Sequence, residues 1–219
     1  MIKAFKYKYP YFPIIGLGLY SIFFLLATTK YPGGSINDIT TVGYSYFHNF
    51  LCDLMLIMTE SGIINAARPL GMVSHILLGL TMMCFFYILP EIFGHTNRNL
   101  IIVRQFGVIT MCIFIFMFTS YHDTIVLLTG IFGTIALIPF FIELPKCEDN
   151  ALKIMSVICF TLSIIVYLSF VTKVGFYYLP MLQKITFVID AFWVVWVSLI
   201  VAKKHEEVGE VYKLNEMNR

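Results

Sequence analysis

The sequence is poor in charged side chains, which make up only 13% of its 219 residues, whereas hydrophobic residues make up 59%. Its mean hydropathy of +0.83 is far above that of soluble domains. A chain with so little charge requires lipid around it, so the composition predicts a polytopic membrane protein. The formal net charge of +2 gives no footprint of a nucleic-acid partner.

Other features are missing as well. The five cysteines form no C-x-x-C pair and share no predicted outer loop, so neither a redox or metal motif nor a disulfide is expected. The sequence has no internal repeat of the kind found in inverted-repeat transporters. The apolar runs do not alternate with the period of barrel strands, which leaves helices as the spanning structure.

Six apolar runs are present instead, each close to the roughly 20 residues that a helix needs to cross the hydrocarbon. We therefore expect one integral membrane domain over residues 1–219, an all-α bundle of six transmembrane helices. A loop at 30–68 and a solvated tail at 203–219 are its longest extramembrane pieces. The predicted spans cover residues 11–29, 69–93, 100–120, 124–144, 152–172 and 184–201.

The distribution of the fifteen Lys and Arg residues predicts the orientation. Eleven of them lie on one side of the membrane if the N-terminus is cytoplasmic: Lys3, Lys6, Lys8, Arg98, Arg104, Lys146, Lys153, Lys203, Lys204, Lys213 and Arg219. The other side holds four: Lys30, Arg68, Lys173 and Lys184. We expect both termini to be cytoplasmic, in a bacterial-type inner membrane, with loop 30–68 outside.

The outer loop contains a segment, residues 45–60, whose apolar residues recur at helical spacing. Asn49 and Asp53 are four residues apart and share the opposite face. The segment is too polar for a comfortable span, so an interfacial or re-entrant helix is predicted. The carboxylate of Asp53 is expected to be oriented by nearby donors such as Arg68, Asn49 or backbone N–H groups.

The sequence Asn49-Phe50-Leu51-Cys52-Asp53-Leu54 resembles the Ser/Cys-Asp-Leu-Gly element of uncharacterised six-span bacterial membrane families and of the DRAM/Sfk-type membrane family. Met55 occupies the position where those families usually have Gly. The element is preceded by Tyr31-Pro32-Gly33-Gly34-Ser35 and by Gly43-Tyr44-Ser45. The resemblance implies a six-helix bundle with a polar outer site around Asp53, and implies no reaction.

Two ionisable residues fall well inside predicted spans, away from the span ends, where charge is costly and function is the default hypothesis. His75 and Asp190 each lie about 9 Å from the outer end of their span at a rise of 1.5 Å per residue. Their common depth predicts that they pair. Gly71 and Gly79 flank His75 on one face, which permits close approach of a neighbouring element. The pair can be a buried structural hydrogen bond, or can serve a substrate, a proton or a metal.

Histidines also raise a zinc alternative. His48, His75 and His122 are predicted on the outer side together with carboxylates, a composition that zinc tolerates. This composition resembles that of the alkaline-ceramidase and adiponectin-receptor superfamily, whose intramembrane hydrolases pair three His with Asp and Ser; Ser74 adjoins His75 here. Those proteins have seven spans and a His-x-x-x-His pair that this chain lacks. Zinc is the one cofactor that this composition suggests. The alternative is that the three residues are ordinary loop or interface histidines.

The sequence leaves three alternative hypotheses about function. The first is binding of a lipid or small ligand in an outward-facing vestibule lined by Asn49, Asp53, His75, His122 and Asp190. The second is a metal-dependent lipid amidase or esterase in which His48, His75 and His122 hold zinc and Asp53 is the base. The third is a proton-coupled carrier with Asp190 and His75 as its relay.

Overall fold

The computed structural model describes residues 8–217, with side chains as far as residue 209, and within this part of the chain no β-strand is present. The long helices are α2 (Phe12–Thr28), α3 (Arg68–Ile88), α4 (Arg98–Phe114), α5 (His122–Glu143), α6 (Asn150–Thr172) and α7 (Leu179–Met217). Short 3-10 helices adjoin or connect them: η1 (Tyr9–Tyr11), η2 (Leu51–Met55), η3 (Leu89–Phe93), η4 (Ile115–Phe118), η5 (Leu144–Lys146) and η6 (Phe176–Tyr178).

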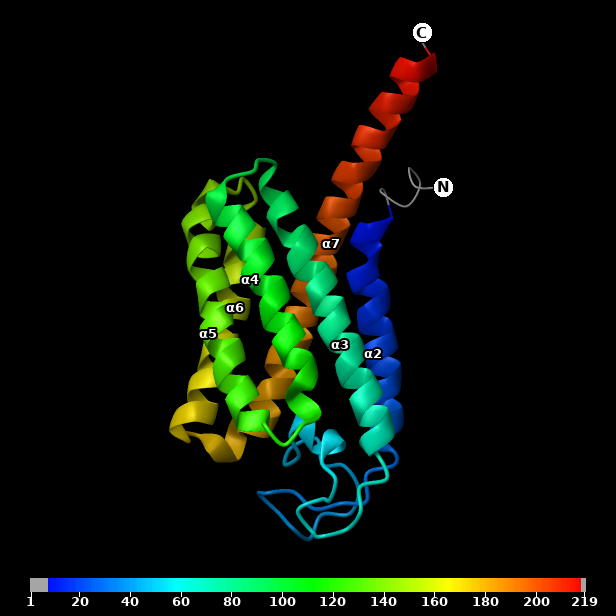
Figure 1. The fold of residues 1–219 in the computed structure, drawn as a ribbon, viewed down its shortest axis with the longest axis vertical. Helices are drawn as coiled ribbons and strands as arrows, with labels where there is room; N and C mark the ends of the chain where they lie inside the picture. Colours follow the sequence, from blue (N-terminus) through cyan, green and yellow to red (C-terminus); the bar gives the residue numbers. More distant parts are fainter. Residues whose placement is uncertain (1–7, 218–219) are drawn as a thin grey trace.

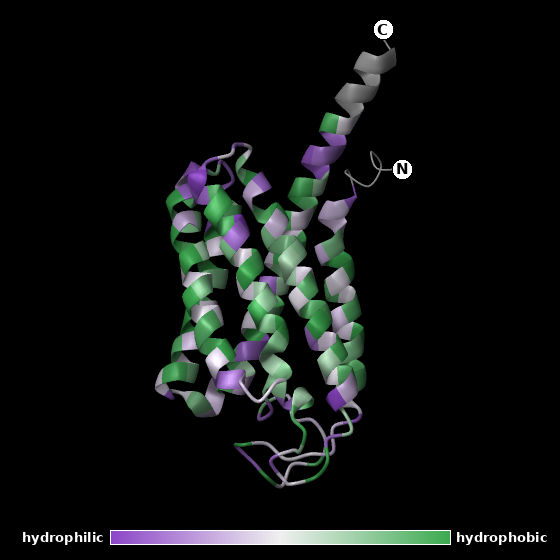
Figure 2. Cartoon of the chain, in the orientation of Figure 1, coloured by the Kyte–Doolittle hydropathy of each residue, from purple (hydrophilic) through white to green (hydrophobic). Residues whose placement is uncertain are grey.

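Six helical stretches in residues 8–217 are long and apolar enough to cross a membrane, which confirms the all-α six-helix bundle. They are Tyr9–Thr28, Arg68–Phe93, Arg98–Phe118, His122–Lys146, Asn150–Thr172 and Phe176–Gly209. Hydrophobic residues cover the helices along most of their length, and hydrophilic residues gather at the two ends (Figure 2). The chain is therefore a multi-pass membrane protein.

The helices begin and end at residues suited to those positions. Asn97 caps α4 by accepting the backbone N–H of Leu100 at 3.0 Å, and Asp149 caps α6 by accepting the N–H of Ala151 at 2.9 Å. Pro69 lies in the first turn of α3, where its missing N–H costs nothing. The last helix starts ahead of the predicted boundary at 184, and it continues through the predicted tail to Met217.

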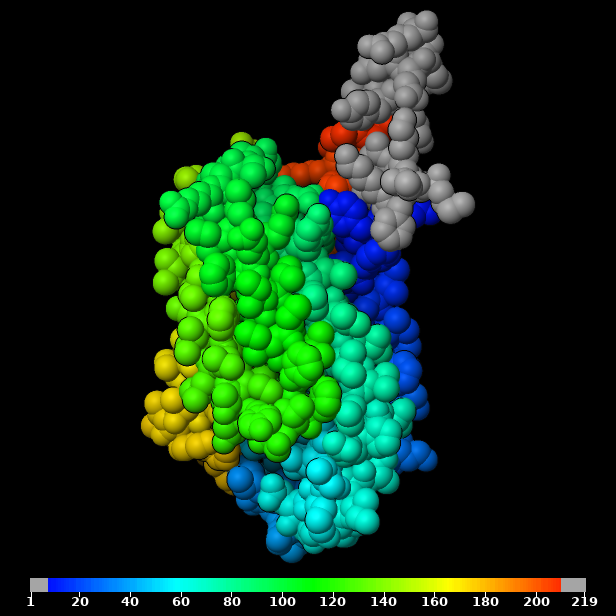
Figure 3. Space-filling view, in the orientation of Figure 1, coloured from blue at the N-terminus to red at the C-terminus, as the bar shows by residue number. Residues whose placement is uncertain are grey.

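The bundle has two distinct ends (Figure 1). The connection between α2 and α3 forms one end, hereafter the loop end, and the start of α2 and the far end of α7 lie at the other, the terminal end. In the space-filling view α4 and α5 cover much of the face that is shown, with α3 beside them and the loop below (Figure 3). An aromatic cluster holds four helices together: Phe85, Phe140, Phe160 and Trp193, with ring centroids 5.0 Å apart for Phe85 and Trp193.

The loop segment differs from its prediction. Instead of a helix over 45–60, turns lead into the five-residue η2, which packs on α3, α7 and η4. A Cβ at Gly71 would collide with the backbone of Leu54, so only glycine allows η2 to lie directly on α3. Gly79 gives η4 similar room at Ile115, which confirms the predicted close approach on both sides of His75.

Candidate functional site

Asp53 is the polar centre of the loop end. Its Oδ2 accepts the side-chain N–H of Asn49 at 2.8 Å and the backbone N–H of Phe50 at 2.9 Å. The prediction that nearby donors orient this carboxylate is therefore confirmed for Asn49 and a backbone N–H. Arg68 contributes differently, because its Nε donates to the carbonyl oxygen of Met55 at 3.2 Å and so braces η2 from behind.

Asn49 is fully buried and joins several parts of the loop. Besides Asp53, its Nδ2 donates to the carbonyl of Gly34 at 2.8 Å and to the Tyr31 hydroxyl at 3.3 Å. Its Oδ1 accepts the backbone N–H of Ser45 at 2.9 Å. Asn49 thus positions Asp53 and does not itself line a cavity.

Burial raises the pKa of the Asp53 carboxyl to about 6, although the hydrogen bonds from Asn49 and Phe50 oppose the rise. Burial also raises the pKa of the adjacent Cys52 thiol well above its usual range, and the charge of Asp53 adds to this effect. A thiol held in the protonated state is a poor nucleophile. Cys52 is therefore a packing residue of the site.

Lys184 connects this centre to the last span. Its Nζ donates to the carbonyl oxygens of Asn49 and of Pro180, the latter at 3.0 Å, and lies 5.5 Å from the centroid of the Tyr44 ring. In the sequence this lysine looked like a marker of the membrane boundary. The structure makes it the cation that fixes loop to α7.

His75 and Asp190 do not pair, so that prediction is wrong. His75 Nε2 donates to the Phe114 carbonyl at 2.8 Å, whereas Asp190 Oδ2 accepts the Ser163 hydroxyl at 3.2 Å. Equal depth fixes the height of two residues but not the rotation of their helices about their axes. His75 faces the α4–η4 junction, and Asp190 faces α6.

The three histidines of the zinc alternative are in different surroundings. His48 lies 6.2 Å from the Tyr177 ring, His75 contacts Phe114, and His122 Nδ1 is 3.0 Å from Asp123 Oδ1. Across the residues that the structure describes, no three His, Cys, Asp or Glu side chains are arranged to hold a metal ion. No observation in the structure favours a zinc-dependent reaction.

Two cavities adjoin inside the bundle. The outer one, of about 660 Å³, opens at the loop end and is lined by Asp53, His75 and His122 among others. The inner one, of about 420 Å³, contains Asp190 in its wall. Four residues line both cavities: Leu78, Phe114, Ser163 and Tyr167. Ser163, Tyr167 and Lys184 were not predicted as site residues, because hydroxyls and a boundary lysine are ordinary in such spans.

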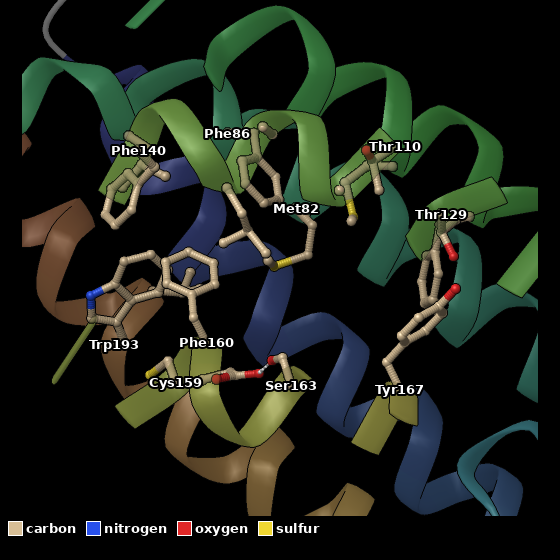
Figure 4. Close-up of a pocket in the computed structure, with 18 of the residues that line it drawn as sticks. Met82, Phe86, Thr110, Thr129, Phe140, Cys159, Phe160, Ser163, Tyr167 and Trp193 are labelled. Atoms are coloured by element: carbon tan, nitrogen blue, oxygen red, sulfur yellow. Dashed lines mark hydrogen bonds between the residues drawn. The ribbon is translucent and has the colours of Figure 1, made fainter. Parts of the chain in front are cut away.

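The inner cavity is mostly apolar and aromatic. Figure 4 shows Met82, Phe86, Phe160 and Tyr167 directed toward one space, with Ser163 beside them. Thr134 of α5 and Ile164 of α6 also line it, and both are exposed on the bundle surface. The wall of the inner cavity therefore includes exposed residues of both α5 and α6.

The terminal end carries two polar clusters that the sequence interpretation missed. Glu143 is fully buried and accepts hydrogen bonds from Lys146 at 2.8 Å and Asn99 at 2.6 Å, with His95 at 3.2 Å. Glu91 accepts the Tyr9 hydroxyl and lies 2.7 Å from His205 Nε2. These clusters join helix ends, and Arg104 Nη2 also lies 3.6 Å from Glu91 Oε1.

Comparison of the chain with protein-family models, with curated proteins and with solved structures finds no match. The resemblance of the Asp53 element to six-span membrane families stays a prediction. The site is therefore interpreted from its own geometry.

Proposed function

We propose that this multi-pass protein binds an amphipathic ligand, a lipid or a small lipid-like molecule, in the two adjoining cavities. The observation that carries the proposal is the difference in charged groups between two cavities that share part of their wall. Carboxylates, imidazoles and an ammonium line the outer part, while aromatic and aliphatic side chains dominate the inner part. Binding sites of this kind are typically 300–1,000 Å³ with a few placed polar groups.

We infer that such a ligand enters from the bilayer between α5 and α6, because exposed residues of both helices line the inner cavity. A molecule dissolved in lipid can slide laterally past Thr134 and Ile164 without leaving the hydrocarbon. The asymmetry of Lys and Arg further supports a plasma-membrane orientation with the loop end outside and both termini in the cytoplasm.

Tryptophan fluorescence can test the proposal. The chain has two tryptophans, Trp193 in the cavity wall and Trp196 outside it. A Trp196→Phe background leaves Trp193 as the only tryptophan reporter. The ligand 10-bromodecanol quenches tryptophan fluorescence on contact through its bromine atom. We expect saturable quenching in nanodiscs, at concentrations where a Trp193→Phe background, which reports from Trp196, shows only the linear quenching of partition.

A cavity-filling variant supplies the matched control. Gly133 lines the inner cavity and has space for a Cβ. The change Gly133→Leu should fill part of this cavity and lower the affinity measured from saturable quenching by tenfold or more. Gly18 is on the exposed face of α2 with open space around it, so Gly18→Leu should leave quenching unchanged. Equal quenching curves for the two variants would reject the cavity as the binding site.

A further inference from the structure

Asp190 has an unusual position for a carboxylate. It stands in the middle of the last span, in the wall of the inner cavity, whose lining also includes several aromatic residues. Its Oδ2 accepts the Ser163 hydroxyl, and the Cys159 thiol also lies within interaction distance of the carboxyl group. Its Oδ1 is buried and has no hydrogen-bond partner within the part of the chain that the structure describes. A carboxylate can accept about four hydrogen bonds, so most of this capacity is unused.

The cavity offers that carboxylate no positive charge. Its lining, within the described residues, includes no Lys, Arg or His. A buried charge without a partner is costly, and such groups are found where a ligand, ion or proton completes them. Ser163 and Cys159 offer neutral donors only, so an ionised Asp190 would find no counter-charge in this lining.

Aromatic rings contribute to the wall of the cavity that Asp190 lines. Phe160, Phe187 and Trp193 line the same cavity as Asp190, and ring faces attract cations, more strongly where water is excluded. A carboxylate flanked by aromatic rings is complementary to a protonated amine that carries an apolar body. A neutral acyl chain would leave Oδ1 without a donor, and an anion would be repelled.

The molecule already holds one alkylammonium against aromatic rings. Lys173, which lines the outer cavity, places its Nζ 4.4 Å from the Phe170 ring centroid and 4.5 Å from that of Phe176. The outer cavity also contains the carboxylates of Asp53, Glu60 and Asp123, which exceed its one lysine in charge. A cation approaching the inner cavity from the loop end therefore meets a net negative field.

We propose that the inner cavity is a site for a lipophilic amine, whose protonated nitrogen donates to Asp190 Oδ1 and whose apolar part packs among the aromatic rings. This inference rests on the proposed function, since it names the chemical class of the ligand in the same cavity. The deep nitrogen position distinguishes it from a lipid held by its head group at the mouth.

The test compares two ligands of the same length in the Trp196→Phe background, 10-bromodecylamine and 10-bromodecanol. A hydrogen bond between charged groups contributes about 1.5–3 kcal/mol, so the wild-type cavity should bind the amine about tenfold to a hundredfold more tightly than the alcohol, after correction for partition. Asp190→Asn keeps the acceptor for Ser163 and removes the charge. It should abolish the preference by weakening amine binding alone.

Each outcome separates the two proposals. Saturable binding of both ligands with no preference in the wild type, or a preference that survives in Asp190→Asn, would overturn the amine site and leave the cavity proposal standing. Saturable binding of neither ligand would overturn both. If Asp190→Asn fails to fold, competition in the wild type decides. Decylamine should then displace 10-bromodecanol at a lower membrane concentration than decanol does, and equal potency of the two competitors would refute the inference.

Discussion

Replacing Asn49 by alanine should destabilise the protein strongly, because this one side chain connects the loop to its carboxylate. The change removes hydrogen bonds to Asp53, Gly34, Tyr31 and Ser45 from a site with no exposed surface. Neutral hydrogen bonds contribute about 1 kcal/mol each and one to a charged group about 2 kcal/mol. With partial rescue by water, the loss is on the order of 4 kcal/mol.

Thermal unfolding in detergent measures this loss. For a chain of this size about 1 kcal/mol corresponds to roughly 2–4 °C, so the Tm should fall by about 10 °C. Asn37→Ala is the matched control, because Asn37 is a loop asparagine with a single exposed hydrogen bond to the Tyr177 carbonyl at 2.9 Å. Its Tm should change by less than about 3 °C.

A double-mutant cycle then isolates the Asn49–Asp53 contact. Once Asp53 is alanine, Asn49→Ala no longer strands a buried carboxylate, so the two losses should be less than additive by about 1–2 kcal/mol. Strict additivity, or a Tm for Asn49→Ala equal to that of Asn37→Ala, would refute the view that Asn49 positions Asp53.

Three further outcomes are expected. The raised pKa of Asp53 means that the folded protein holds this proton more tightly than the unfolded chain does. The free energy of unfolding should therefore fall by up to ~3 kcal/mol as the pH rises from about 4 to about 6. In unfolding measured across this pH range, Asp53→Asn should flatten the dependence. Glu143→Ala should cost about 1–3 kcal/mol, because Asn99 loses a charged acceptor while the exposed Lys146 stays solvated, and Glu143→Gln should cost clearly less in the same unfolding assay; equal losses would contradict the role of the Glu143 charge. Val42→Cys, at a position that is 96% exposed, should react with an impermeant thiol reagent on intact cells, and Glu207→Cys only after permeabilisation; the reverse pattern would invert the orientation.

The fold could be predicted from the sequence because crossing a membrane constrains a chain simply. Apolar length and the need to satisfy every backbone hydrogen bond leave little besides helices. One predicted span start differs clearly from the structure: residue 184, whereas α7 begins at Leu179. The prediction was too late because Lys184 was taken as the membrane boundary. Its long side chain instead reaches along α7 to the Asn49 carbonyl from inside the helix.

The site was predicted less completely, since sequence gives depth and spacing but not helix rotation. Asn49 and Asp53 are four residues apart, a local relation that survived even though the segment forms a 3-10 turn instead of an α-helix. His75 and Asp190 belong to different helices, and their common height could not reveal that one faces Phe114 and the other Ser163. The cavities themselves depend on how six helices pack, which no single run encodes.

The position of a bound ligand tests the central claim most directly. Anomalous scattering from crystals grown with 10-bromodecanol would locate the bromine atom. We predict a bromine peak inside the inner cavity, in contact with residues such as Phe86, Phe160 or Trp193. Bromine found solely on the lipid-facing surface of the helices, with the inner cavity free of ligand density, would contradict the account.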